Sequence, residues 1–187
     1  MLMPKQIISR RAVVASATLV PLSTIRTSAA PASVFTQLQR RTLEAFLDRL
    51  VPKDGLGPGA VECGAANYID TSLADFLAAE KAQFLDGIDA VDAYARKMHD
   101  GPFAELAPDR QDAVLQEIER SSRVFFDRVR RLAIEGMMSD PHYGGNANFA
   151  GWDLIRYPGP RLAVSADDQK MSGAAKPLRS SAYGHGH

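Results

Sequence analysis

Apolar residues recur every three or four positions along most of the chain, and this spacing constrains the fold more than any other feature. The first such segment, VFTQLQRRTLEAFLDRLVP, has the apolar spacing of an amphipathic helix, with Phe35, Leu38, Leu43, Phe46, Leu47 and Leu50 at intervals near three and four. Pro52 and Gly55 follow directly and end the pattern. No segment alternates apolar and polar residues over the length of a strand. The periodicity therefore predicts an all-α domain.

Four further helical patterns follow, at about residues 61–77, 82–99, 106–120 and 123–138. Ser121 and Ser122 mark either a break between the last two or a step on the surface of one helix. We expect Phe76 and Leu77 on the buried face of the second helix and Met98 on that of the third. Short linkers between the patterns favour a compact bundle of four to five helices.

Composition excludes several classes of function. Lys+Arg and Asp+Glu both total 22, so the formal net charge is zero and we expect no nucleic-acid binding. The single cysteine, Cys63, excludes an intrachain disulfide, CxxCH haem attachment and multi-cysteine metal or iron–sulfur sites. We interpret Cys63 as a small apolar core residue, with a redox thiol or an intermolecular disulfide as the alternatives.

Motifs that carry chemistry are missing from the sequence. There is no GxSxG, no GxGxxG and no Walker loop, so we assign no catalytic or cofactor-binding residue. Asp140 and His142 are two positions apart and could serve as metal ligands, but two groups do not complete a coordination sphere. A free-standing metal-binding protein or small enzyme that uses these two residues is therefore the alternative interpretation, and we predict no metal site.

The first 32 residues have the layout of an export signal. Basic residues, including the pair Arg10 and Arg11, precede a short apolar stretch and then small residues up to Ala32, after which we expect cleavage. The arginine pair is typical of a twin-arginine signal, and an ordinary secretory signal is the alternative. The twin-arginine route exports folded proteins, so it suits a chain that travels to the periplasm with a cofactor-bearing partner.

A long loop follows the last helical pattern and reads GMMSDPHYGGNANFAGWDLIRYPGP, residues 136–160. Proline after Asp140 ends the helix, and the Gly144–Asn146 turn tolerates positive φ. Four aromatic residues alternate with these turns: Tyr143, Phe149, Trp152 and Tyr157. The loop either folds back to cap its own helical core or docks into another subunit, and both can hold at once.

Two sequence blocks, FLDRLVPKDGLGPGAVECGAANYID and DPHYGGNANFAGWDLIRYPGP, resemble the gluconate 2-dehydrogenase subunit 3 family. The resemblance covers about residues 35–160. It implies the small (gamma) subunit of a membrane-bound, flavin-dependent sugar or sugar-acid dehydrogenase. In such a complex a GMC-type flavoprotein with FAD oxidises the substrate, and a multihaem cytochrome c subunit passes the electrons on. The small subunit holds no cofactor, escorts the flavoprotein during export and reaches the membrane only through its partners.

The resemblance carries over no catalytic residue. We predict that the motif residues shape a loop that contacts the flavoprotein: Asp140, Tyr143, Gly144, Gly145, Asn146, Gly151, Trp152, Tyr157, Pro158 and Gly159. The predicted organisation is a signal peptide at 1–32, a helical domain at 33–160 and a disordered tail at 161–187, where small and polar residues dominate. A free-standing structural domain remains a further alternative.

Overall fold

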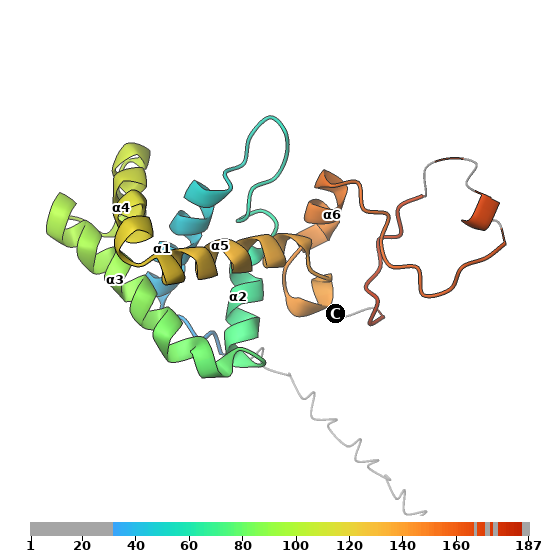
Figure 1. Ribbon diagram of the computed structural model, residues 1–187, viewed down its shortest axis with the longest axis horizontal. Coiled ribbons are helices and arrows are strands. Elements are labelled where there is room, and N and C mark those ends of the chain that lie inside the picture. The colour runs from blue at the N-terminus through green and yellow to red at the C-terminus, as the bar shows by residue number, and fades with distance from the viewer. Residues whose placement is uncertain (1–31, 167, 171–172, 174–175, 185–187) are drawn as a thin grey trace, which may run out of the picture. The chain divides into compact units, whose positions relative to one another are not determined.

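The computed structural model describes residues 32–166, 168–170, 173 and 176–184. The chain divides into two units, Met1–Ala32 and Ser33–His187, and the elements below all lie in the second. Six α-helices follow one another in it: α1 (Gln37–Leu50), α2 (Ala65–Ala74), α3 (Lys81–His99), α4 (Pro108–Ser121), α5 (Arg123–Met138) and α6 (Ala150–Leu154). The described residues contain no strand, and the all-α prediction is confirmed (Figure 1).

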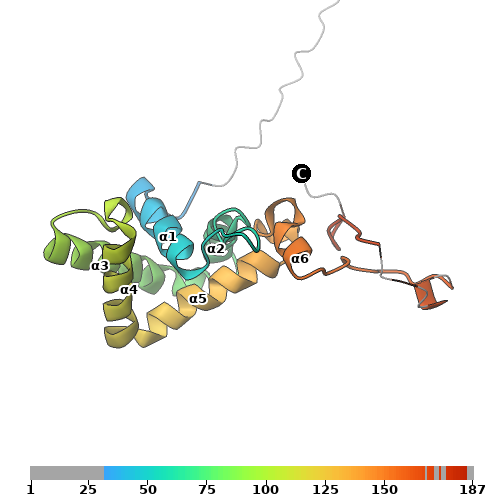
Figure 2. The ribbon, with the colours of Figure 1, turned by 90° about the horizontal axis from the view of Figure 1, so that it is seen from above.

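Helix α5 packs against α1, α2, α4 and α6. It contacts α4 near its start, α1 and α2 along its length and α6 near its end (Figure 2). Its pairing with α2 is the most extensive, and it is also close, because a Cβ on Gly136 would lie 2.9 Å from the Cα of Ala65. The end of α5, from which the long loop emerges, is therefore held firmly against α2.

Aromatic rings fill the centre of the bundle. The ring of Phe46 on α1 is fully buried and lies 5.6 Å from Phe126 and 6.3 Å from Phe125 on α5. Cys63 is also fully buried, as expected for a small core residue, and burial raises the pKa of its thiol.

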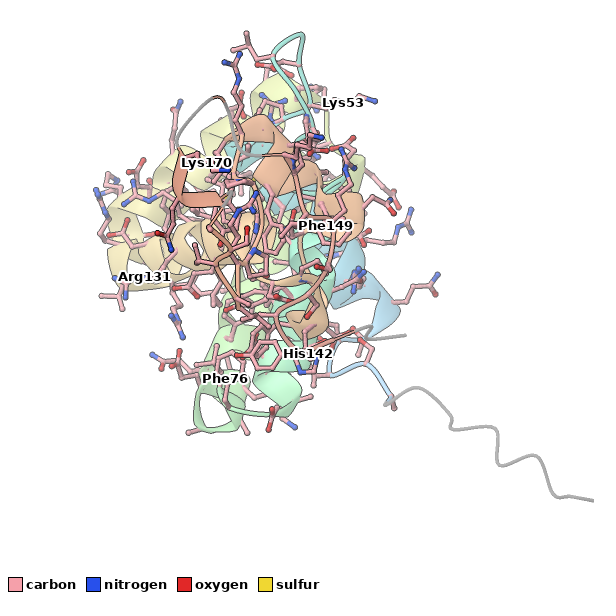
Figure 3. All side chains as sticks on the ribbon, turned by 90° about the vertical axis from the view of Figure 1, so that its right-hand side faces the viewer. Lys53, Phe76, Arg131, His142, Phe149 and Lys170 are labelled. Atoms are coloured by element: carbon pink, nitrogen blue, oxygen red, sulfur yellow. The ribbon has the colours of Figure 1, made fainter. Side chains whose placement is uncertain are left out.

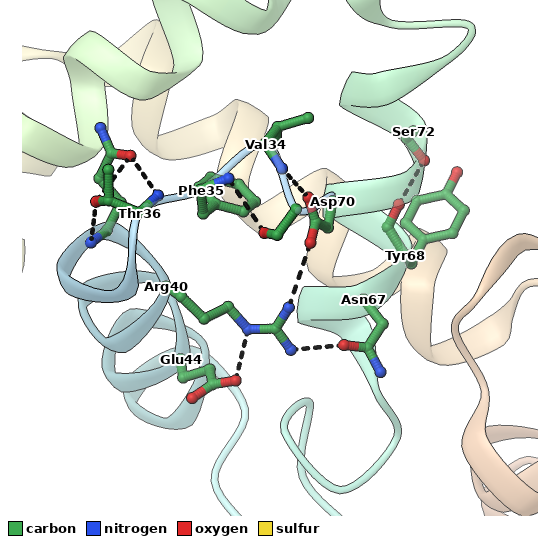
Figure 4. Close-up of polar contacts among 11 residues, drawn as sticks. Val34, Phe35, Thr36, Arg40, Glu44, Asn67, Tyr68, Asp70 and Ser72 are labelled. Atoms are coloured by element: carbon green, nitrogen blue, oxygen red, sulfur yellow. Dashed lines mark hydrogen bonds and ion pairs between the residues drawn. The ribbon is translucent and has the colours of Figure 1, made fainter. Parts of the chain in front are cut away.

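The start of α1 is fixed by a capping box. The hydroxyl of Thr36 accepts from the backbone N–H of Gln39 at 3.2 Å, and the Gln39 side chain accepts from the Thr36 N–H at 3.0 Å. Arg40, one turn further, connects α1 to α2 by bonds to Asn67 and Asp70 (Figure 4). The capping box thus fixes the first turn of α1, and the contacts of Arg40 hold that turn against α2.

Several details of the helices differ from the prediction, and α6 lies within the segment that was expected to be a loop. Helix α2 begins at Ala65 instead of about Val61 and ends at Ala74, so Phe76 lies beyond it and is 56% exposed. Met98 is also exposed. Leu38, near the start of α1, is exposed as well. After α3, the N–H of Phe103 donates to Asp92 at 2.9 Å, and the Phe103 ring is fully buried.

The break between the last two long helices is real. Ser122 ends α4 and precedes α5, with backbone angles outside the helical region. Across the part of the chain that the structure describes, no helix has both the length and the apolar character needed to span a bilayer.

Candidate functional site

The long loop folds back against the end of α5. After α5 the chain forms two single turns of 3₁₀ helix, η3 (Pro141–Tyr143) and η4 (Ala147–Phe149), and then α6, which packs on α5 (Figure 1). The backbone N–H of Ala147 also donates to the carbonyl of Cys63 at 2.9 Å. This bond joins the two sequence blocks noted above, which are far apart along the chain.

Asn146 organises the loop. Its side chain is fully buried, and its backbone N–H donates to the carbonyl of Gly136 at 2.7 Å. The side-chain amide donates to the carbonyl of Ser139 at 3.0 Å. The side-chain oxygen accepts from the N–H groups of Gly151 at 2.9 Å and Trp152 at 3.3 Å. One side chain thus satisfies a carbonyl at the end of α5 and two amides at the start of α6.

Two glycines of the loop are required by backbone contact. A Cβ on Gly145 would overlap the carbonyl of Gly136, and one on Gly151 would overlap the carbonyl of Met137. Gly144 has φ +87°, a conformation that other residues adopt only with strain. These glycines therefore let the loop backbone lie directly on helix α5.

Trp152 is anchored within its own chain. It is only 6% exposed, and its indole N–H donates to the carbonyl of Met138 at 2.9 Å. Its ring packs edge-on against Tyr157 at 5.1 Å and lies 5.4 Å from Phe149. In the structure the loop therefore folds back onto its own helical core. Its contact with a flavoprotein stays a prediction.

Asp140 accepts hydrogen bonds from one backbone amide of the loop and one of the C-terminal segment. One oxygen accepts from the N–H of His142 at 2.9 Å, and the other accepts from the N–H of Ala182 at 2.8 Å. Burial raises the pKa of Asp140, but the bonds from Ser181, His142 and Ala182 outweigh it and hold the pKa below its ordinary value. The carboxylate therefore serves as an ionised acceptor that holds the loop and the C-terminal segment together.

His142 and Tyr143 lie beside the same C-terminal segment. The His142 ring stacks on Tyr183 at 4.6 Å, and the hydroxyl groups of Tyr143 and Tyr183 are 2.8 Å apart. Tyr143 also meets Phe76 edge-on, and Figure 3 shows Phe76 and His142 at the same end of the domain. Within the described residues, no three His, Cys, Asp or Glu side chains gather as metal ligands.

Pro158 and Gly159 end the loop. The carbonyl of Pro158 accepts from the N–H of Leu178 at 2.6 Å, and a Cβ on Gly159 would overlap the carbonyl of Leu178. The structure thus brings all ten predicted loop residues into one region. Arg10 and Arg11 lie outside the described residues.

Sequence reasoning missed the apolar side chains that this region presents to solvent. Leu154 and Ile155 follow Trp152 and are exposed, Ile155 to 56%. Leu56, at the tip of the loop between α1 and α2, is exposed as well. The loop that carries Leu56 lies near Leu154, because a Cβ on the adjacent Gly57 would come 2.7 Å from the Leu154 side chain. The only sequence signal for Leu56 was its place in the first of the two blocks.

An open groove of about 470 Å³ runs beside these residues. Its walls include Met138, Trp152, Ile155 and Tyr157 on the loop side and Tyr183 on the side of the C-terminal segment. A mainly apolar groove next to exposed apolar side chains is suited to bind another protein chain.

Comparison with known proteins identifies one family. The family model described as gluconate 2-dehydrogenase subunit 3 matches residues 37–159, which contain α1 to α6 and end at the glycine that closes the loop. No curated protein matches the chain. No solved structure matches it either.

Proposed function

Because the chain belongs to the gluconate 2-dehydrogenase subunit 3 family, we propose that it is the non-catalytic small subunit of a periplasmic, membrane-associated dehydrogenase complex. The complex oxidises gluconate or a related sugar acid, sugar or polyol. FAD belongs to a GMC-type flavoprotein subunit and haem c to a cytochrome subunit, which attaches the assembly to the membrane. This chain assists the folding, export and stability of the flavoprotein.

The family match over 37–159 is the observation that carries the proposal. The geometry of the loop supports it, because its polar motif groups bond to groups of the same chain. Asn146 joins α5 to α6, and Asp140 accepts from backbone amides. Such residues give the loop a fixed shape, as an accessory subunit requires.

We place the contact with the flavoprotein on the exposed apolar side chains around α6. Leu154, Ile155 and Tyr157 come from the loop, and Leu56 comes from the first sequence block. Apolar and aromatic side chains that stand on a rigid backbone are typical anchors of protein interfaces. The buried Trp152 supports this surface from below.

Co-expression with the flavoprotein tests the escort role. Replacing Arg10 and Arg11 together by lysine removes the proposed twin-arginine signal but keeps its charge. We expect the flavoprotein to stay in the cytoplasm, as measured by its activity in periplasmic and cytoplasmic fractions. Arg26→Lys, a like change outside the pair, is the control. Full flavoprotein activity in the periplasm of the double variant would contradict the escort role.

The metal-binding alternative is tested on the isolated chain. Elemental analysis of purified protein, with and without the Asp140→Asn and His142→Ala changes, measures any bound metal. A stoichiometric metal that depends on these residues, or turnover of a sugar without partners, would replace the proposed function by that alternative.

A further inference from the structure

The end of the chain returns to the loop that the family defines. Residues 176–184, called the strap below, lie beyond the family match, which ends at 159. The N–H of Leu178 donates to Pro158, and the N–H of Ala182 donates to Asp140. Between them, the Arg179 guanidinium lies 2.7 Å from the Asp153 carboxylate. The strap therefore follows the loop from its end back to its beginning.

The strap engages groups that would otherwise face a partner. The Ala182 N–H donates to Asp140, the Tyr183 hydroxyl accepts from the Tyr143 hydroxyl, and the Tyr183 ring stacks on His142. Ala182 and Tyr183 also form one wall of the 470 Å³ groove. A protein chain bound in this groove would therefore contact the strap.

The strap is lightly held. Leu178 and Tyr183 remain 41% and 62% exposed, and none of the described strap residues belongs to the buried core. Among the described residues, it is held by hydrogen bonds, by the exposed ion pair of Arg179 with Asp153, and by contacts of the Tyr183 ring with His142 and Tyr143. Exposed ion pairs contribute little and the buried apolar area is small, so the strap can leave without disturbing the bundle.

We propose that the strap is a displaceable cover of the partner site, which binds Pro158, Asp140 and His142 in the free subunit and is replaced when the flavoprotein docks. The segment that replaces it is an extended stretch of the partner that offers backbone N–H donors to Pro158 and Asp140 and an aromatic side chain to His142. This inference rests on the proposed function. The strap thereby lowers the apparent affinity of the free subunit for the flavoprotein. This affinity is the intrinsic affinity multiplied by the fraction of molecules in which the strap has left the site.

Variants of the full chain test this competition. Tyr183→Ala removes both the ring stack and the hydroxyl contact, and Tyr183→Phe removes the hydroxyl contact alone. We expect the flavoprotein to bind Tyr183→Ala about tenfold more tightly than the original chain, with Tyr183→Phe between the two. Leu162→Ala, at an exposed position of the same tail, is the control and should bind like the original. Titration calorimetry with the purified flavoprotein measures the dissociation constants.

Hydrogen exchange provides the second measurement. The amides of Leu178 and Ala182 should be protected in the free subunit and should exchange faster in Tyr183→Ala. Equal or weaker binding of the flavoprotein to Tyr183→Ala would contradict the proposal that the strap covers the partner site, and so would unprotected amides in the free chain. Either result would leave the proposed function intact. If no variant binds the flavoprotein, the proposed function itself fails, and the inference fails with it.

Discussion

The side-chain oxygen of Asn146 accepts the backbone N–H of Gly151 at 2.9 Å, and this bond holds the start of α6 on the end of α5. Asn146 adopts φ +45°, in the left-handed region that asparagine enters more readily than most residues. The same residue thus supplies both the bond and the backbone turn that the loop needs.

Substitutions at Asn146 separate these two contributions. Asn146→Gly keeps the backbone conformation but removes the side-chain bonds, and should lower the free energy of unfolding by about 2 kcal/mol. Asn146→Ala adds backbone strain at positive φ and should cost about 1 kcal/mol more. Urea denaturation followed by circular dichroism measures both. Equal stability of the alanine and glycine variants would argue against a strained turn.

Gly151→Ala tests the close approach of the loop to α5. The added Cβ would overlap the carbonyl of Met137, so α6 must shift, and we expect a loss of about 2 kcal/mol or more. Gly55→Ala is the matched control, because a Cβ there meets nothing within 4 Å. The two variants should differ clearly in melting temperature, and similar values would show that the backbone contact is loose.

Trp152 should matter first for the stability of the free subunit. Trp152→Ala leaves a cavity between α5 and α6 and should cost about 3–5 kcal/mol. Trp152→Phe keeps a ring but leaves the Met138 carbonyl without its donor, at about 1–2 kcal/mol. Phe76→Ala, at an exposed ring, should change little. If Trp152→Ala left the stability unchanged and weakened only the complex, Trp152 would be an interface anchor instead.

Ile155→Asp should weaken the complex without destabilising the subunit. The side chain is exposed in the free chain, so a charge there is solvated until the flavoprotein buries it. We expect a loss of about 2 kcal/mol in binding free energy, measured by calorimetry. Val124→Asp, on an exposed apolar residue at the opposite end of α5, is the control. Equal effects of the two changes would place the interface elsewhere.

Acid should weaken the contact between α1 and α4. The Arg49 guanidinium bonds both oxygens of Asp112, at 2.7 and 2.8 Å, and this pairing holds the pKa of Asp112 below its ordinary value of 3.8. A carboxyl with a lowered pKa stabilises the fold above its ordinary pKa, and this contribution disappears as pH falls through the pKa of the folded state. Asp48 also attracts the Arg49 guanidinium, so Arg49 keeps part of its electrostatic stabilisation when Asp112 is protonated.

Unfolding experiments between pH 2 and 7 measure this effect. Asp112→Asn should lose stability at neutral pH and show a shallower decline in acid than the original chain. Asp86→Asn, at an exposed position of α3, should keep the original slope. An unchanged acid slope in Asp112→Asn would mean that the pair contributes nothing measurable, as is found for many surface ion pairs.

Sequence reasoning located the long helices well and their ends less well. The apolar spacing correctly predicted α1, α3, α4 and α5, because this signal acts between residues three or four positions apart. Of the two interpretations of Ser121 and Ser122, the structure shows the break. The errors at Phe76 and Met98 lie at helix ends. At a helix end the apolar spacing does not determine which side chains are covered, because that depends on the path of the segment that follows.

By itself, the sequence determined that this chain is helical, where its glycine turns fall and which family its two blocks resemble, because all three depend on short-range order along the chain. Only the tertiary structure decided which side chains those turns bury and which they expose. The Cys63 carbonyl meets the Ala147 amide, and Trp152 turns inward while Ile155 faces solvent. Such outcomes depend on how the end of α5 packs against elements distant in sequence, which no local pattern encodes.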